Sequence, residues 1–192
     1  SLDELFLAAE TLTRGQATKS TALTILTNGG GAGVMAADAA AYQHVTLANL
    51  SEQTLEKLNA VLPANWSHAN PVDIIGDAPA QRYVDALNVL TNDAAAGTIL
   101  LIQAPTAIVP SADIARAVVR SSENGASLTR LMSSWLGGHA VDAARQIFTD
   151  KGIATFDTPE QAVRAIAMLQ AYSRNQLELM EAPSAHVDIV LP

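Results

Sequence analysis

A run of glycines, Asn28-Gly29-Gly30-Gly31-Ala32-Gly33, stands between a short β-branched segment and an apolar segment of helical character. Glycine has no Cβ, so several backbone N–H groups can point into one small concavity and a ligand can approach them closely. A helix that begins here adds unpaired N–H groups and about half a positive charge at its N-terminus. The run therefore predicts a cradle for an anionic group such as a phosphoryl group, formed without basic side chains.

The alternative is a tight strand-to-helix turn that needs glycine only for its backbone conformation. One or two glycines satisfy such a turn, whereas four stand within positions 29–33, and this excess favours the anion site. The run is not a Walker A motif, because no Lys and Ser/Thr follow its last glycine. It does not give G-x-G-x-x-G in any frame, and it does not resemble the Ser/Thr-rich phosphate loop of flavodoxins.

Two further loops carry candidate residues. Asp73, in Asn70-Pro71-Val72-Asp73, is a candidate ligand orienter or general base, but a carboxylate near Pro and Gly more often fixes a turn by accepting backbone N–H bonds. A Gly pair follows a later apolar segment, and there a turn and a ligand role are equally open. The possible substrate-side residues of these loops are Asn70, Asp73, Gly76, Gly137 and Gly138.

A nucleophile is missing from this set. Of the four histidines, His139 alone is expected near these loops, at a helix N-terminus where a cation is disfavoured. The sequence shows no Ser-His-Asp set and no metal-ligand spacing. We therefore expect an anion cradle with neither a catalytic residue nor a metal site in this chain.

Alternating strand-like and helix-like segments must position these loops. This alternation predicts a three-layer α/β fold, with a five-stranded parallel sheet covered by helices on both faces. A flavodoxin-like strand order, 2-1-3-4-5, is the simplest topology, and it places ligands at the carboxyl ends of the first and third strands. A helix is expected to begin at Gly33, and 65–80 is expected to be irregular. The expected strands are 22–27, 44–47, 98–102, 128–135 and 153–156.

Composition limits the classes of partner. The chain has 192 residues, of which 49% are hydrophobic and 16% charged, and this balance is typical of a globular domain. Its formal net charge of −8, without a Lys/Arg run, gives no electrostatic reason to bind nucleic acid or an anionic membrane. No stretch approaches the roughly 20 apolar residues of a membrane span. The absence of cysteine and of a signal peptide favours a cytoplasmic location.

Domain boundaries follow from the same segments. We expect the domain to cover residues 21–182. Residues 1–20 are expected to be a helix and linker from a preceding domain, and residues 183–192 a linker.

Four motifs carry a resemblance to a known family. In this order, they resemble the succinyl-CoA-ligase-like domain of NDP-forming acyl-CoA synthetases, including the versions fused to protein lysine acetyltransferases. The resemblance covers nearly the whole chain and implies the flavodoxin-like fold. It also implies an acid–thiol ligase that converts acyl-CoA, NDP and phosphate to acid, NTP and CoA. The motifs are residues 28–38, 70–73, 134–138 and 156–163.

The resemblance also implies how such a chain takes part in the reaction. A histidine carries the phosphoryl group to ADP, and two helices from related domains aim their N-termini at this phosphohistidine. The helix expected from Gly33 resembles one of them. The histidine is expected in a preceding CoA-binding and ligase region, and the nucleotide in an ATP-grasp domain of the same protein.

CoA, ADP or ATP, and Mg²⁺ are thus implied as cofactors of the full-length enzyme, together with a small-molecule acyl substrate. None is expected to bind tightly to this chain, which on its own is expected to be inactive. One departure concerns the loop Gln103-Ala104-Pro105-Thr106, where related ligases tend to have glycines. This loop therefore leaves the identity of the acyl group open.

Two other functions stay open at the level of sequence. The chain is alternatively a non-catalytic domain that senses CoA esters, or a scaffold, within a protein lysine acetyltransferase. A weaker alternative is a flavin or nucleotide binder that uses the same fold.

Overall fold

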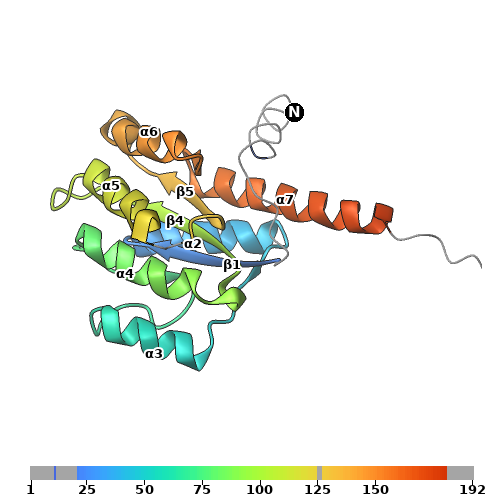
Figure 1. The fold of residues 1–192 in the computed structure, drawn as a ribbon, viewed down its shortest axis with the longest axis horizontal. Helices are drawn as coiled ribbons and strands as arrows, with labels where there is room; N and C mark the ends of the chain where they lie inside the picture. The colour runs from blue at the N-terminus through green and yellow to red at the C-terminus, as the bar shows by residue number, and fades with distance from the viewer. Residues whose placement is uncertain (1–10, 12–20, 125–126, 181–192) are drawn as a thin grey trace, which may run out of the picture.

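The computed structural model describes residue 11 and residues 21–124 and 127–180. The helix and linker expected over 1–20 and the linker expected over 183–192 lie outside the described residues, apart from Thr11. The described chain is a three-layer α/β fold in which a parallel sheet lies between two layers of helices, as Figure 1 shows. The expected fold class is therefore confirmed at this level.

All strand pairings of the sheet are parallel. The strands lie in the order β2-β1-β4-β5-β6, and β3 also pairs with β1. Their bounds are β1 (Ala22–Thr27), β2 (Thr46–Leu47), β3 (Val72–Asp73), β4 (Thr98–Gln103), β5 (Leu131–Trp135) and β6 (Ala154–Phe156).

The helices cover both faces. Helices α2 and α7 contact each other on one face, whereas α4, α5 and α6 follow one another across the other face, with α3 packed against α4. Among the described residues, no helix combines the length and apolar character needed to cross a membrane. The bounds are α2 (Gly30–Tyr42), α3 (Glu52–Val61), α4 (Ala80–Thr91), α5 (Ser111–Ser121), α6 (Asp142–Asp150) and α7 (Pro159–Met180), with short 3₁₀ turns at Ala94–Ala96, Ser122–Asn124 and Gly138–Val141.

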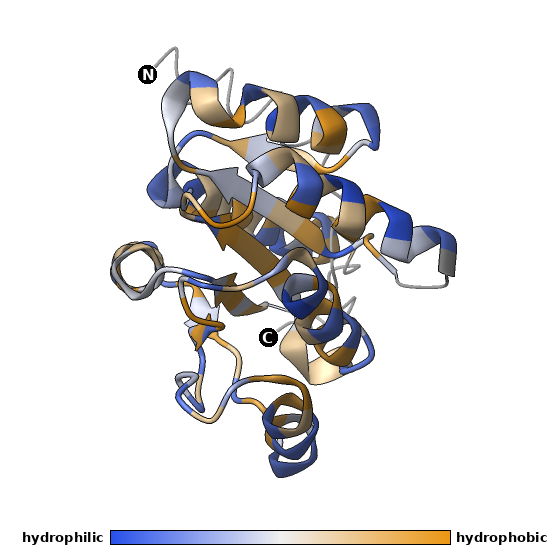
Figure 2. Ribbon diagram, turned by 90° about the vertical axis from the view of Figure 1, so that its left-hand side faces the viewer, coloured by the Kyte–Doolittle hydropathy of each residue, from blue (hydrophilic) through white to orange (hydrophobic). Residues whose placement is uncertain are grey.

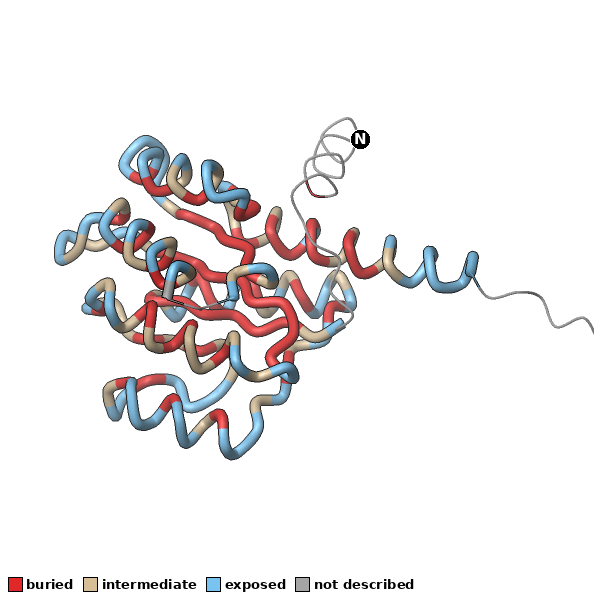
Figure 3. Tube along the Cα trace, in the orientation of Figure 1, coloured by how far each residue is buried: buried red, intermediate tan, exposed pale blue. Residues whose placement is uncertain are grey.

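The sheet separates two hydrophobic clusters, one under each helical layer. In the central strand β4, Ile99 and Leu101 belong to one cluster and Leu100 and Ile102 to the other, so β4 is buried on both faces. Hydrophobic residues predominate in the strands, whereas the surrounding helices alternate hydrophobic and hydrophilic residues (Figure 2). In Figure 3 the strands are mostly buried, whereas buried and exposed residues alternate along the helices. The core thus fixes the sheet, and the loops at its carboxyl edge are left to carry a site.

The expected count of five strands is wrong, because β3 was read as part of an irregular segment. β3 has only two residues, which pair with Leu26 and Thr27 of β1, and Pro and Asp in its motif are typical of turns. The five-stranded order 2-1-3-4-5 is therefore replaced by a six-stranded sheet in which β2 and β3 both border β1.

The side chain of Asn70 fills the gap between β2 and β3 along β1. Its Oδ1 accepts a hydrogen bond from the N–H of Ile25 at 3.0 Å. Its Nδ2 donates to the carbonyl oxygens of Leu23 at 2.8 Å and Ala48 at 3.1 Å. A side-chain amide therefore takes the place of a strand residue, and Asn70 is a structural bridge rather than an exposed ligand-binding group.

Local signals set several element boundaries. Ser51 caps α3 by accepting a hydrogen bond from the N–H of Thr54 at 3.2 Å. Thr158 accepts one from the N–H of Gln161 at 3.2 Å, and α7 begins directly after it, at Pro159.

Tyr83 of α4 is a buried polar group without a visible function. Its side chain is 0% exposed, and its hydroxyl has no hydrogen-bond partner among the described residues. Burial raises the pKa of Tyr83 well above its ordinary value, the Arg82 guanidinium partly opposes this rise, and the Asp73 carboxylate adds to it. The folded state therefore strongly favours the neutral phenol.

We predict that Tyr83→Phe stabilises the fold at high pH. At pH 7 the variant should equal or exceed the wild type by up to about 1 kcal/mol, because an unsatisfied buried hydroxyl is removed. Above about pH 10 the unfolded wild type releases a proton that the folded state retains, so wild-type stability should fall by about 1.4 kcal/mol per pH unit relative to the variant. Urea unfolding between pH 7 and 11.5 measures both effects, and parallel alkaline losses in the two proteins would contradict the prediction.

We also predict that Asn70→Ala destabilises the fold by about 2–4 kcal/mol, because it leaves buried backbone groups of β1 without partners. The matched control is Asn65→Ala, at an exposed position, which should change the free energy of unfolding by less than about 0.5 kcal/mol. Urea denaturation of both variants provides the comparison. Equal stability of the two variants would show that the bridge contributes nothing.

Candidate functional site

The glycine run lies at the N-terminus of α2, at the carboxyl edge of the sheet. The helix begins at Gly30 rather than at the expected Gly33, and Gly29 is its N-cap, without a side-chain cap. Gly29 donates its N–H to Thr27 Oγ1 at 3.0 Å, and Gly33 donates its N–H to the carbonyl of Gly29 at 3.1 Å. The N–H groups of residues 30–32 are therefore those that lack an intrahelical acceptor. Within the cradle expected over Asn28–Gly33, the N–H groups that remain available to an anion are therefore those of Gly30, Gly31 and Ala32.

Close packing explains why the helix starts with residues of low helix propensity. A Cβ on Gly29 would lie 3.1 Å from the Cβ of Ala104, and one on Gly30 would lie 3.0 Å from Asp73 Oδ2. A Cβ on Gly33 would lie 3.0 Å from Thr27 Cγ2. Only Gly31, of the four glycines, has no atom within 4 Å of its Cβ position. Three glycines thus have a packing reason, and open space remains at Gly31.

Asn28 is a connector rather than part of the cradle surface. Its side chain is 4% exposed, its Nδ2 donates to the carbonyl of Ala104 at 2.9 Å, and its Oδ1 accepts from the N–H of Ala104 at 2.8 Å. Gln103 also donates to the Ala104 carbonyl, at 3.0 Å, and its Oε1 accepts from Ser111 Oγ at 3.0 Å. The start of the loop after β4 is therefore held by hydrogen bonds to Asn28, and Gln103 is held by Ser111.

The loop after β3 also reaches α2. Asp73 Oδ1 accepts a hydrogen bond from the N–H of Ile75 at 2.9 Å, which is the turn role favoured from the sequence. Its other oxygen faces Gly30. Gly76 lies close to Asn28: a Cβ on Gly76 would be 3.6 Å from the carbonyl oxygen of Asn28. Asp73 and Gly76 are thus brought next to the glycine run.

The Gly pair after β5 forms a turn at the same edge. Gly137 and Gly138 have φ values of +123° and +54°, which L side chains rarely adopt, and a Cβ on Gly137 would lie 2.9 Å from Pro105 Cγ. Backbone conformation and packing therefore explain this pair as a turn. His139 follows with a fully exposed side chain, and its Nδ1 lies 3.0 Å from Asp142 Oδ2. Among the described residues, no hydrogen bond or ion pair links His139 to the glycine run.

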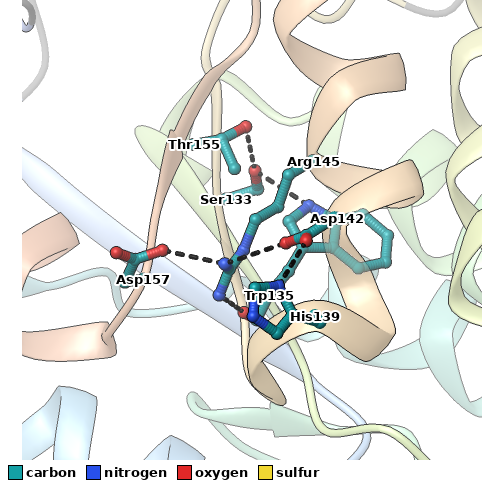
Figure 4. Close-up of polar contacts among 7 residues, drawn as sticks. All are labelled: Ser133, Trp135, His139, Asp142, Arg145, Thr155 and Asp157. Carbon is teal, nitrogen blue, oxygen red and sulfur yellow. Dashed lines mark hydrogen bonds and ion pairs between the residues drawn. The ribbon is translucent and has the colours of Figure 1, made fainter.

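Arg145 of α6 organises this corner, and the sequence analysis missed it. Its Nη2 donates to the carbonyl of Trp135 at 2.6 Å, and its Nη1 lies 3.0 Å from Asp157 and 3.7 Å from Asp142, as Figure 4 shows. The guanidinium therefore joins the ends of β5 and β6 to α6, with two carboxylates around its charge. The signal was weak, because an isolated Arg in an amphipathic helix resembles any surface cation.

The arrangement offers backbone donors for a negative group. Three N–H donors and the positive end of the helix dipole lie together at the N-terminus of α2, and both attract an anion. Among the described residues, no cluster of three or more His, Asp or Glu could hold a metal ion. The chemistry available here is electrostatic stabilisation.

The outer side of α2 is unusually apolar for an exposed helix. Its sequence holds a single charged residue, Asp38, and the side chains of Val34, Met35 and Tyr42 are exposed. A groove of about 570 Å³ lies between α2 and α7, lined by Met35, Asp38, Ala39, Tyr42, Gln43, Glu160 and Arg164. A helix that is apolar on all sides is typically covered in the complete protein.

We predict opposite effects for two Gly→Ala substitutions in the first turn of α2. Gly33→Ala should destabilise by about 1–3 kcal/mol, because the new methyl group meets Thr27 and Pro71. Gly31→Ala should be neutral or stabilising by up to about 1 kcal/mol, because the site is open and Ala favours a helix. Urea denaturation compares them, and equal losses would contradict the packing explanation.

Comparison with known proteins agrees with this geometry. The profile of the family described as "Ligase-CoA domain" matches residues 23–183. The ADP-forming acetate–CoA ligase I of Archaeoglobus fulgidus is 40% identical over 174 residues, which cover 91% of this chain and 24% of that protein. The ADP-forming acetate–CoA ligase of Methanocaldococcus jannaschii is 35% identical over 156 residues, covering 80% of this chain and 22% of that protein.

A solved structure shares the fold. The dinucleotide-forming acetyl-coenzyme A synthetase 1 of Ca. Korarchaeum cryptofilum, in complex with phosphate and ADP, matches with a TM-score of 0.86 and 25% identity. The match covers 95% of this chain and 40% of that one, and the chain spans about a quarter of the length of the two archaeal ligases. The resemblance stated from the four motifs is confirmed: the chain belongs to the Ligase-CoA domain family.

Proposed function

We propose that this chain is a domain of an NDP-forming acyl-CoA synthetase, in which the N-terminus of α2 stabilises a phosphoryl group carried by a histidine of another domain. The observation that carries the proposal is the set of three N–H groups, at Gly30, Gly31 and Ala32, that lack intrahelical acceptors at the start of α2, where Gly30 and Gly31 are exposed. Such preorganised donors lower the barrier of phosphoryl transfer by stabilising negative charge as it moves.

The reaction divides between this chain and the rest of the protein. Acyl-CoA and phosphate give acyl phosphate and CoA. The phosphoryl group then passes from acyl phosphate to the histidine as the P–O bond to the acid breaks and the acid leaves, and ADP accepts it from the histidine to give ATP. The role of this chain is to hold the charge of the phosphoryl group during its time on the histidine. The described residues offer donors for an anion and no metal-binding cluster, so Mg²⁺ and the nucleotide are assigned to an ATP-grasp domain, and CoA to a CoA-binding domain.

The exposed side of α2 supports the need for another domain. Val34 and Met35, which follow the donors by one turn, are 57% and 48% exposed. The ligases with which this chain aligns are about four times longer, so most of such a protein lies outside the aligned region. Another domain that packs over this side of α2 would bring its histidine to the helix end while covering apolar surface.

A second candidate function is a regulatory or scaffold domain in a protein lysine acetyltransferase. The packing of Gly29, Gly30 and Gly33, which accounts for three glycines without any ligand, is compatible with such a non-catalytic role. The two functions differ in whether the full-length protein forms phosphohistidine at all. Phosphorylation of the protein by radiolabelled ATP, stable to base and labile to acid, is the discriminating observation.

We predict that Gly30→Asp in the full-length protein lowers the rate of phosphohistidine formation by about 100-fold or more, because it places a second carboxylate beside the donors. Labelling from ATP and from acetyl-CoA with phosphate measures the effect. Asn65→Asp is the control, since it adds the same carboxylate at an exposed position outside the glycine run. It should retain activity within about threefold.

Thermal unfolding of the 192-residue chain checks that Gly30→Asp still folds. Undiminished labelling in a folded Gly30→Asp variant would refute the proposed role of α2.

A further inference from the structure

The carboxylate of Asp73 lies directly beside the helix end that is proposed to bind the phosphoryl group. Its Oδ2 is 3.0 Å from the Cβ position of Gly30, the first residue of α2. A phosphoryl group held by the N–H groups of residues 30–32 would share this helix end with a second negative charge. That is an unfavourable neighbour for a site whose purpose is anion binding.

The position of Asp73 is fixed by several contacts. Its N–H donates to Ser67 Oγ at 2.9 Å, and its Oδ1 accepts from the N–H of Ile75 at 2.9 Å. Its backbone pairs with Thr27 in the sheet, and the N–H of Ile74 donates to the Thr27 carbonyl at 2.8 Å. The carboxylate is therefore held at the helix end by the fold and by its own turn.

No cation forms an ion pair with Asp73 among the described residues. Within residues 21–124 and 127–180, Oδ2 has no hydrogen-bond or ion-pair partner. The guanidinium of Arg82 is committed to Asp77 Oδ1 at 2.6 Å and to the Ile74 carbonyl at 2.9 Å. The remaining favourable interaction of Asp73 Oδ2 is with the positive end of the α2 dipole, which is also what attracts a phosphoryl group.

We propose that Asp73 sets the affinity of the α2 site, keeping the phosphoryl group weakly bound so that it can leave for the next acceptor. This inference rests on the proposed function and adds a role for one residue. Two charges about 5 Å apart, at an effective dielectric constant between that of a protein surface and that of water, change affinity by about tenfold. Weak ground-state binding also avoids trapping the phosphoryl group before transfer.

The test is a titration of the 192-residue chain with inorganic phosphate, followed by NMR at the amides of residues 30–32. Asp73→Asn keeps the side-chain volume and an acceptor for Ile75, and removes the charge. It should bind phosphate about tenfold more tightly than the wild type. Asp38→Asn is the matched control, because it changes the net charge equally on the same helix, two turns away, and should stay within about twofold.

A second variant separates charge from shape. Asp73→Ala removes the acceptor for Ile75 as well as the charge, and it should tighten phosphate binding to a similar degree if charge is the cause. Spectra without phosphate verify that each variant is folded. In 1 M NaCl the difference between the wild type and Asp73→Asn should shrink, because exposed charges are screened.

The outcomes separate the two proposals. Equal or weaker phosphate binding by Asp73→Asn, with shifts centred on residues 30–32 in both proteins, would overturn the role of Asp73 and leave the α2 site intact. An absence of shifts at these amides in every variant would instead overturn the α2 anion site, and with it the role proposed for Asp73.

Discussion

The close approach of the first turn of α2 to the loops after β3 and β4 is the constraint on which the rest of the site depends. The Asn28 side chain joins the end of β1 to Ala104 through two hydrogen bonds, so the first turn of α2 begins in close contact with the loop after β4. A Cβ at Gly29 or at Gly30 would meet its neighbour at 3.1 or 3.0 Å, closer than ordinary van der Waals contact. The helix end is therefore held in place by the same contacts that require glycine there.

This constraint gives the glycines two roles that cannot be separated by sequence. Gly29 and Gly33 are required by packing, whereas the backbone of Gly30, Gly31 and Ala32 offers the free N–H groups. A glycine-rich start costs helix stability relative to alanine, by roughly 1 kcal/mol per residue. The cost is offset by burial of the inner side of α2, where Ala36 and Ala40 are fully buried against the sheet.

The fold class and the place of the glycine run could be predicted from the sequence, because apolar runs such as 98–103 and caps such as Ser51 are local signals. β3 could not, since a two-residue strand has no periodicity and its register depends on β1. The hydrogen bonds made by the side chains of Asn28 and Asn70 could not be predicted either, because their partners lie 76 and up to 47 residues away in the sequence. The sequence shows that a side-chain amide is present, but not whether its hydrogen bonds are made to the backbone of the same chain or are free for a ligand.

The bridge formed by Asn70 has a consequence for how this family can diverge. Its contacts reach only main-chain atoms of β1 and of Ala48, which every residue type presents alike. The bridge itself therefore sets no requirement on the side chains of Leu23 and Ile25, which are restricted instead by their burial in the core. Position 70, in contrast, should be restricted to an amide of this length by the hydrogen bonds alone.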